Sequence, residues 1–244
     1  MKKEILIKGY ILVILSAILF GCMPLITKYI YAEGISRETA VLLRNSLALP
    51  VLALLTWRQD RSFAIPVKAL PAIGLLALVG YCITTLLLYG SYQHIASGTA
   101  TVFHFVYPVM VVLVEVVFFR KKVHPGTVLA VLLCVGGVCL FYNPNEPLNW
   151  TGCALALTSG VTYAVYVVLL AAFRYKQVSG FKLTFYISAS CAVLMLAICL
   201  ATNSLTLPTT LSGWLLCVLL SQYDACLLGV NMASLLERAR KAQM

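Results

Sequence analysis

The stretch that decides the fold is residues 69–114, ALPAIGLLALVGYCITTLLLYGSYQHIASGTATVFHFVYPVMVVLV, in which 46 consecutive positions contain no Asp, Glu, Lys or Arg. A membrane-spanning helix needs about 20 mostly apolar residues. The stretch is therefore too long for one span and long enough for two. The polar run from Ser91 to Gly98 predicts the connection between them, so we expect helices near 69–90 and 98–119.

The composition of the whole chain agrees with a membrane protein. Of its 244 residues, 61% are hydrophobic and 11% are charged, and the mean hydropathy is +0.95. Soluble domains have about 45–50% apolar and about 25% charged residues. This composition excludes a soluble globular enzyme, a disordered chain and a disulfide-rich secreted module.

Metal and cofactor sites are not predicted. The nine cysteines lie in apolar segments without a C-x-x-C pair, and the three histidines are dispersed along the chain. A free cysteine in such a segment behaves as a small hydrophobe. Glycine-rich nucleotide-binding patterns are also missing from the sequence, so we expect no metal and no cofactor.

Other runs of low charge predict the remaining spans. They lie near residues 9–31, 39–57, 126–142, 151–173 and 183–201, with a last span beginning near Leu211. Arg44 is the one charged residue within 39–57. The predicted fold class is therefore an all-α polytopic membrane protein with about eight transmembrane helices.

The basic residues predict the orientation. The net charge is +10, and with the N-terminus inside, 15 of the 18 basic residues fall in inner segments; the others are Lys28, Arg37 and Arg44. This distribution follows the positive-inside rule. Short basic clusters between apolar runs also argue against nucleic-acid binding, which needs a basic face. The expected partners are the lipid bilayer and a small-molecule substrate.

The sequence contains a weak internal repeat at an offset of 143 residues. Gly9 matches Gly152, Leu12 matches Leu155 and Ser16 matches Ser159, and the second and seventh spans share the offset. A unit with an odd number of helices reverses direction when repeated, and inverted repeats are common in secondary transporters. We predict a five-helix repeat over 1–145, the start of an inverted second repeat over 146–220 and an atypical segment over 221–244.

Several short motifs follow one another in an order that resembles the EamA-type carriers of the drug/metabolite transporter superfamily. They are Leu43-Arg44-Asn45, Ala96-Ser97-Gly98-Thr99-Ala100, Tyr107-Pro108, Gly136-Gly137-Val138 and Trp150-Thr151-Gly152. The resemblance implies ten helices in two inverted five-helix repeats. It also implies carriage of small metabolites and no enzymatic activity.

The chain departs from that pattern in two places. The family often has an acidic residue just before the fifth helix, where this chain reads Arg120-Lys121-Lys122-Val123. The second repeat contains at most three of its five helices. Asp224 would lie about 13 residues into the last span, and two interpretations stay open. Either the chain leaves the pattern near Ser221 through truncation, or Asp224 is a functional acid within the membrane.

Ionisable residues within spans are costly, which makes them candidates for function. Arg44 can bind a carboxylate or phosphate through two hydrogen bonds. The alternative is that it extends toward Glu33 or Glu38. His104 shares a helix face with Thr101 and Ser97, and we expect it to contact an anionic substrate or carry a proton; a neutral, structurally satisfied histidine is the alternative.

Further candidates come from three tyrosines and one acid. Tyr107, Tyr163 and Tyr166 are predicted to contact the substrate, because an aromatic ring with a polar tip suits a metabolite; helix packing is the alternative. Glu115 is predicted to carry a proton, unless it pairs with Lys121 or Lys122. Pro108 lies on the same helix and is expected to kink it.

The sequence thus predicts an integral protein of the cytoplasmic (inner) membrane that acts as a secondary transporter of small metabolites, driven by an ion gradient. Export is one open direction. The alternative is a truncated, inactive fragment of such a transporter. Association into a homo-oligomer also stays open.

Overall fold

A computed structural model describes residues 21–120, 125–140, 149–173 and 178–222. All regular structure in these ranges is helical. Five helical stretches are long and apolar enough to cross a membrane: Arg37–Asp60, Val67–Ser91, Ser97–Val114, Trp150–Ala172 and Gly180–Ala201. The predicted class of an all-α polytopic membrane protein is confirmed. Asp224 lies outside the described residues.

The helix bounds follow the uncharged runs closely. The helices are α2 (Arg37–Asp60), α3 (Leu70–Leu76), α4 (Thr84–Ser91), α5 (Ser97–His104), α6 (Tyr107–Phe119), α7 (Pro125–Leu140), α8 (Trp150–Ala172) and α9 (Gly180–Ala201). Residues 21–32 are also helical, and a shorter apolar helix occupies Leu211–Gln222. Turn and coil residues separate α4 from α5 where the polar run predicted a connection.

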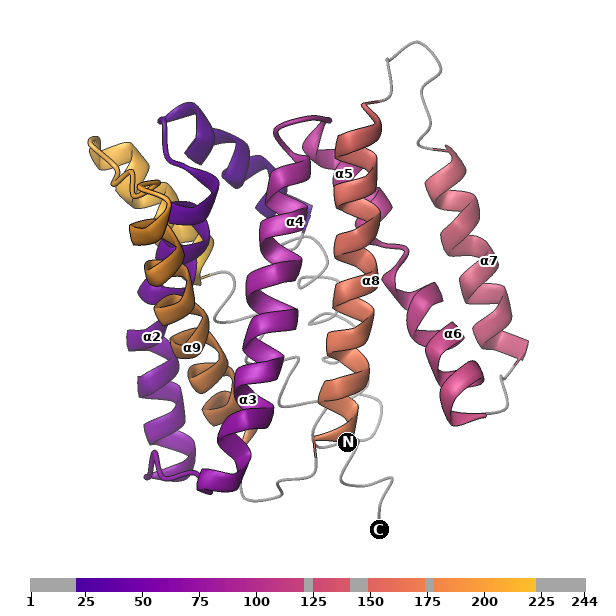
Figure 1. Ribbon diagram of the computed structural model, residues 1–244, viewed down its shortest axis with the longest axis horizontal. Coiled ribbons are helices and arrows are strands. Elements are labelled where there is room, and N and C mark those ends of the chain that lie inside the picture. The colour runs from indigo at the N-terminus through magenta and orange to yellow at the C-terminus, as the bar shows by residue number, and fades with distance from the viewer. Residues whose placement is uncertain (1–20, 121–124, 141–148, 174–177, 223–244) are drawn as a thin grey trace, which may run out of the picture.

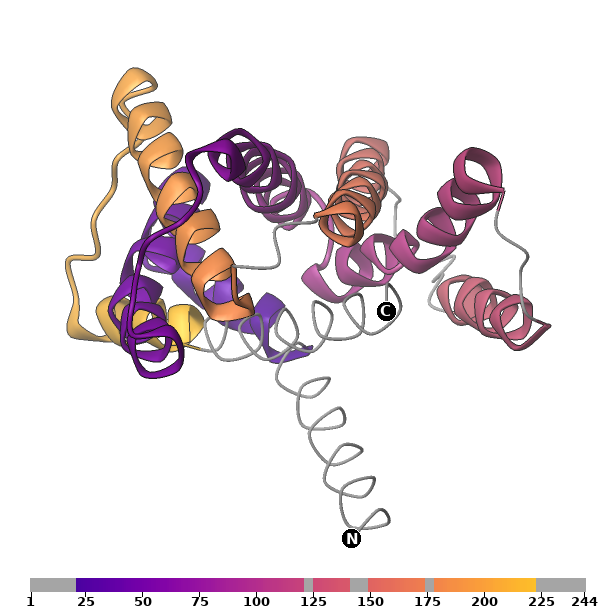
Figure 2. The ribbon, with the colours of Figure 1, turned by 90° about the horizontal axis from the view of Figure 1, so that it is seen from below.

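The helices form two neighbouring groups. α2 packs against α9, and α8 packs against α4, α5 and α6. Figure 1 shows α2 and α9 at one end of the molecule and α6 and α7 at the other, with α4 and α8 between them. The view from below in Figure 2 places α7 outside α6, away from the other helices. α8 is therefore the helix that connects the broken pair α5–α6 to the rest of the bundle.

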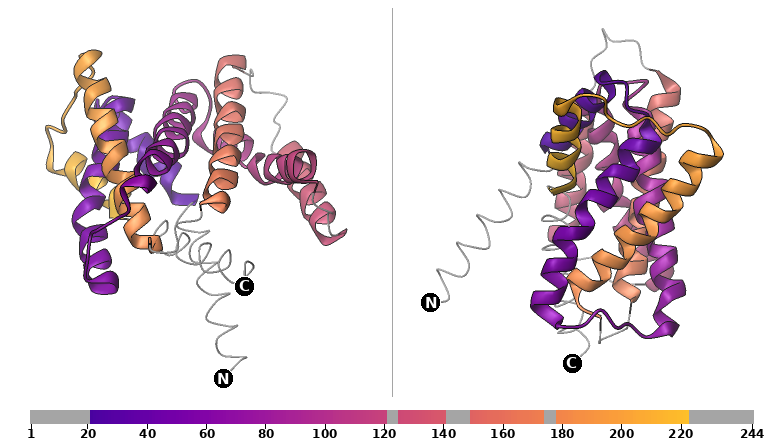
Figure 3. Two further views of the ribbon diagram at one scale, coloured as in Figure 1. Left: turned by 60° about the horizontal axis from the view of Figure 1, so that its bottom comes forward. Right: turned by 90° about the vertical axis from the view of Figure 1, so that its left-hand side faces the viewer.

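Serine caps join α2 and α9 at both ends. Ser36 caps α2 by accepting from Thr39 N, and its hydroxyl lies 2.5 Å from the Ser204 carbonyl oxygen just beyond α9. Ser179 caps α9 by accepting from Lys182 N, and its hydroxyl lies 2.5 Å from Asp60 Oδ2 at the end of α2. Such a cap contributes about 1 kcal/mol. Figure 3 shows the two helices side by side.

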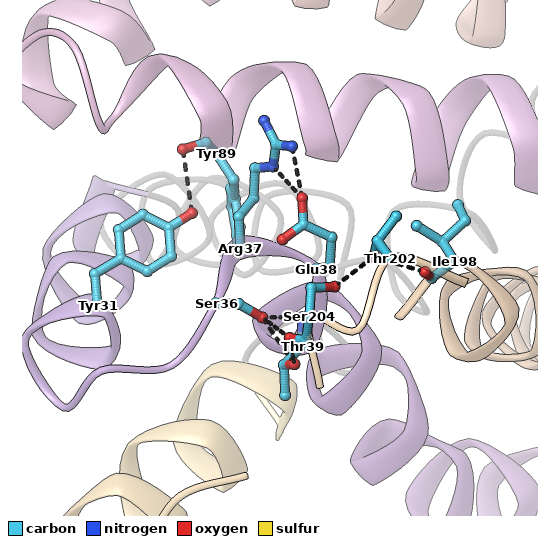
Figure 4. A network of polar contacts seen from close by, with 9 residues as sticks. All are labelled: Tyr31, Ser36, Arg37, Glu38, Thr39, Tyr89, Ile198, Thr202 and Ser204. Carbon is cyan, nitrogen blue, oxygen red and sulfur yellow. Dashed lines mark hydrogen bonds and ion pairs between the residues drawn. The ribbon is translucent and has the colours of Figure 1, made fainter. Parts of the chain in front are cut away.

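The end of α2 that carries Ser36 is held by a wider polar network, drawn in Figure 4. Thr39 Oγ1 donates to the Ser204 carbonyl over 3.0 Å. Arg37 pairs with Glu38, and Tyr31 Oη donates to the Tyr89 carbonyl over 3.1 Å. These bonds connect residues 21–32, α2, α4 and the segment after α9.

The predicted helix near 69–90 has three kinds of helical geometry. Its first turn, Val67–Ala69, is a 3₁₀-helix, and Ala77–Ile83 between α3 and α4 is a π-helix. We expected one regular helix over this range. Thr84 Oγ1 lies 2.7 Å from the Val79 carbonyl five residues earlier and 2.8 Å from Thr162 Oγ1 on α8. π-Helical turns are rare and often occur at functional sites.

Candidate functional site

The fourth span is interrupted in its middle. We predicted one helix near 98–119 with a kink at Pro108, but residues 105 and 106 separate α5 from α6. Phe105 N bonds to both Thr101 and Val102 carbonyls, which tightens the last turn of α5. Proline has no N–H, so the His104 carbonyl four residues before Pro108 cannot receive the usual helical bond. The break therefore lies one turn before the proline.

α8 packs directly against this break. A Cβ atom placed on Gly160 would lie 2.8 Å from the His104 carbonyl oxygen. Only glycine lets the two backbones approach so closely without a shift. Gly160 was not among the predicted site residues, although a glycine in the middle of an apolar span is a signal of close helix packing.

His104 is buried at this contact, with 2% of its surface exposed. Its Nδ1 atom lies 2.8 Å from Ser159 Oγ on α8. Its ring centroid lies 5.4 Å from that of Tyr163 and 5.8 Å from that of Tyr107. The structure thus brings together a histidine and two tyrosines from three helices, all of them predicted site residues.

The tyrosine cluster extends further along α8. Tyr107 and Tyr163 meet edge to face with centroids 4.7 Å apart, and Tyr163 lies 5.5 Å from Tyr166. Tyr166 continues the cluster to Tyr81 at 6.1 Å. The Tyr166 ring lies over Gly80 in the π-helical turn, where a Cβ would come within 2.2 Å of it. Gly80 was not identified from the sequence, because its importance depends on a ring from another helix.

Arg44 lies in an adjoining polar group. Its Nη1 atom donates to Tyr89 Oη over 3.1 Å, and its guanidinium carbon lies 5.7 Å from the centre of that ring. Tyr89 stacks on Tyr92, whose hydroxyl lies 3.3 Å from Thr101 Oγ1. These contacts connect α2 to Thr101, which lies one turn before His104 in α5.

The acidic residues considered as alternative partners for Arg44 have contacts of their own. Glu38 accepts from Arg37. Glu33 accepts from Thr210 and Ser212 at the start of the helix Leu211–Gln222. Those hydroxyl bonds, chiefly the one from Thr210, lower the pKa of the Glu33 carboxyl below its ordinary value.

Other predictions fall outside what the structure describes. The backbone of Glu115 belongs to α6, but its side chain and the pairing residues Lys121 and Lys122 lie outside the described part. Among the described residues, no group of three His, Cys, Asp or Glu could hold a metal ion. Two buried thiols, Cys82 and Cys191, approach each other with sulfurs 3.1 Å apart between the π-helical turn and α9.

Comparison with known protein families identifies a relationship. The model of the EamA-like transporter family matches residues 7–143, more than half of the chain. No curated protein matches the chain. The matched range includes α2 to α7, and so it contains the break at His104 and the predicted residues Arg44 and Tyr107.

Proposed function

Because this chain belongs to the EamA-like transporter family, we propose that it is a secondary transporter that carries small metabolites across the cytoplasmic membrane, driven by an ion gradient and with its N-terminus inside. The observation that supports the site is the break between α5 and α6, which α8 covers with Gly160. Broken helices in the middle of the membrane are typical of transporter substrate sites.

The substrate contacts are proposed to come from His104, Tyr107, Tyr163 and Tyr166. The rings of Tyr107 and Tyr163 pack against each other with centroids 4.7 Å apart, so a substrate that binds between them must replace this ring contact. Tyr107 belongs to α6 and Tyr163 to α8. Movement of α6 away from α8 would therefore expose the faces of both rings at once, and closure would restore the contact after release.

Arg44 is proposed to bind an anionic part of the substrate beside this cluster. Tyr89 orients the guanidinium by accepting a hydrogen bond from Nη1, and a guanidinium can bind a carboxylate or phosphate in a bidentate manner. His104 or Glu115 is proposed to exchange the coupling proton.

Two repeats are proposed for the chain, over 1–145 and 146–220. The serine caps support the repeat, since Ser36 and Ser179 are 143 positions apart (179 − 36) and each begins a helix of the α2–α9 pair. Each cap also contacts the end of the other helix. An approximate two-fold axis in the membrane plane would produce this reciprocal arrangement.

The test is uptake of a defined mixture of small metabolites into proteoliposomes that contain the purified protein, read by mass spectrometry. We expect uptake of at least one compound above that of empty liposomes, and its loss when a proton ionophore removes the gradient. Tyr163→Ala should reduce that uptake at least tenfold, whereas Tyr29→Ala, which removes a tyrosine that is 56% exposed, should retain it.

A second pair of variants tests Arg44. Arg44→Lys keeps the charge and loses the bidentate geometry, so it should retain part of the uptake that Arg44→Ala abolishes. Normal uptake by Arg44→Ala would remove Arg44 from the site. A folded protein that moves no compound in the mixture would contradict transport and favour the inactive alternative.

A further inference from the structure

The direction of the single hydrogen of the Ser159 hydroxyl determines which nitrogen of His104 is protonated. Ser159 is fully buried on α8, and its Oγ donates to the Ala156 carbonyl over 2.6 Å. The same oxygen lies 2.8 Å from His104 Nδ1. A serine hydroxyl has one hydrogen and two acceptor lone pairs. Since the hydrogen is directed to Ala156, the oxygen must accept from His104, and Nδ1 must carry a hydrogen.

The position of that hydrogen fixes what the rest of the ring can do. In a neutral imidazole one nitrogen is the donor and the other is the acceptor. With the hydrogen on Nδ1, the lone pair is on Nε2. Within the described part of the chain Nε2 has no hydrogen-bond partner, and the titratable side chains that face the ring are Tyr107 from α6 and Tyr163 from α8.

We infer that Ser159 is a positioning residue that holds His104 in its Nδ1–H tautomer, so that Nε2 accepts a hydrogen bond from an N–H or O–H group of the substrate. This inference rests on the proposed function for its last step and specifies the chemistry of that site. It replaces the expectation that His104 binds an anion. A primary amine is the group that fits best, because the rings of Tyr163 and Tyr107, centred 5.4 and 5.8 Å from the imidazole, can also attract an ammonium ion through their faces.

The tautomer is measured first, independently of transport. Full-length protein with His94→Gln and His124→Gln retains His104 as its single histidine and can be labelled with ¹⁵N in lipid nanodiscs. Solid-state NMR should show a protonated Nδ1 and an unprotonated Nε2. Ser159→Ala should give a mixture of tautomers, and Ser159→Thr, which keeps a hydroxyl, should restore the single form. A hydrogen on Nε2 in the unsubstituted protein would overturn the inference.

The substrate chemistry is tested on the same sample with two probes of similar size. Addition of 2-phenylethylamine should shift the Nε2 resonance, whereas 3-phenylpropionate should leave it in place. A shift with the carboxylate alone, or with neither probe, would overturn the assignment of an N–H donor. These shifts report binding at His104, so they remain distinguishable from a failure of the protein to transport either compound in proteoliposomes.

Discussion

Replacement of Gly160 by alanine tests whether α8 positions the broken helix. The new Cβ would lie 2.8 Å from the His104 carbonyl oxygen, and ordinary contact begins at 3.4 Å, so the two backbones must separate by 0.6 Å (3.4 − 2.8). Overpacking of this kind costs about 1–3 kcal/mol. Separation also strains the Ser159–His104 hydrogen bond, and bonds between membrane helices contribute about 0.6 kcal/mol.

The matched control is Gly98→Ala in α5, where a Cβ meets nothing within 4 Å. Alanine is favoured over glycine by about 1 kcal/mol in a helix interior. Gly160 receives this gain in the middle of α8, whereas Gly98, the second residue of α5, does not receive it in full. We therefore expect Gly160→Ala to be about 1–3 kcal/mol less stable than Gly98→Ala. The measurement is the unfolding midpoint in mixed detergent micelles, together with the His104 tautomer by NMR. Equal midpoints and an unchanged His104 spectrum would refute the argument from close packing.

Three further outcomes are expected. Gly80→Ala should lower both stability and transport, because its Cβ would lie 2.2 Å from the buried Tyr166 ring. Gly74→Ala adds a Cβ in open space and should change neither property. Equal melting temperatures and equal uptake of the two variants would contradict this prediction. Asp60→Asn should destabilise the protein more alone than when combined with Lys182→Met, because the buried Lys182 ammonium, 3.4 Å from Asp60 Oδ2, loses its carboxylate partner. A double-mutant cycle by denaturant unfolding measures the coupling between the two residues, and strictly additive effects would exclude that coupling. Glu33 has a lowered pKa in the folded protein. Its contribution to stability is therefore present above its ordinary pKa of 4.5 and disappears as the pH falls through the lower pKa of the folded protein. Glu33→Gln should remove this part of the pH dependence of the melting temperature.

The positions of the five long apolar helices in the described ranges could be predicted from the sequence, because lipid imposes one requirement on every residue of a span. Residues 69–114 contain no charged side chain and have to enter the membrane, whereas the polar residues in the middle of this run have to leave it. The same reasoning placed α8 and α9 within three residues of their ends. These features depend on the local sequence alone.

The details of the site depend on contacts between helices, which periodicity does not reveal. Pro108 indicated a distortion, but the break lies at residues 105 and 106, where the Gly160 backbone approaches. In the sequence Ser159 was notable only as the match of Ser16 in the repeat, and its contact with His104 depends on how α8 packs against α5. Arg44 was predicted to bind an anionic group, with Glu33 or Glu38 as the alternative, and its hydrogen bond to the Tyr89 hydroxyl depends on the packing of α2 beside α4.

The reciprocal caps of α2 and α9 also determine when the polar ends of α2 obtain their partners during biosynthesis. Ser36 and Ser179 are 143 residues apart, and ribosomes add about 5–20 residues per second. α2 must therefore wait about 7–30 s in the membrane before the helix that completes its polar ends is made. During that interval its terminal hydroxyls and Asp60 need other partners, such as water, lipid headgroups or an insertion factor. The polar ends of α2 therefore obtain their final partners only after α9 emerges, long after α2 itself has been inserted.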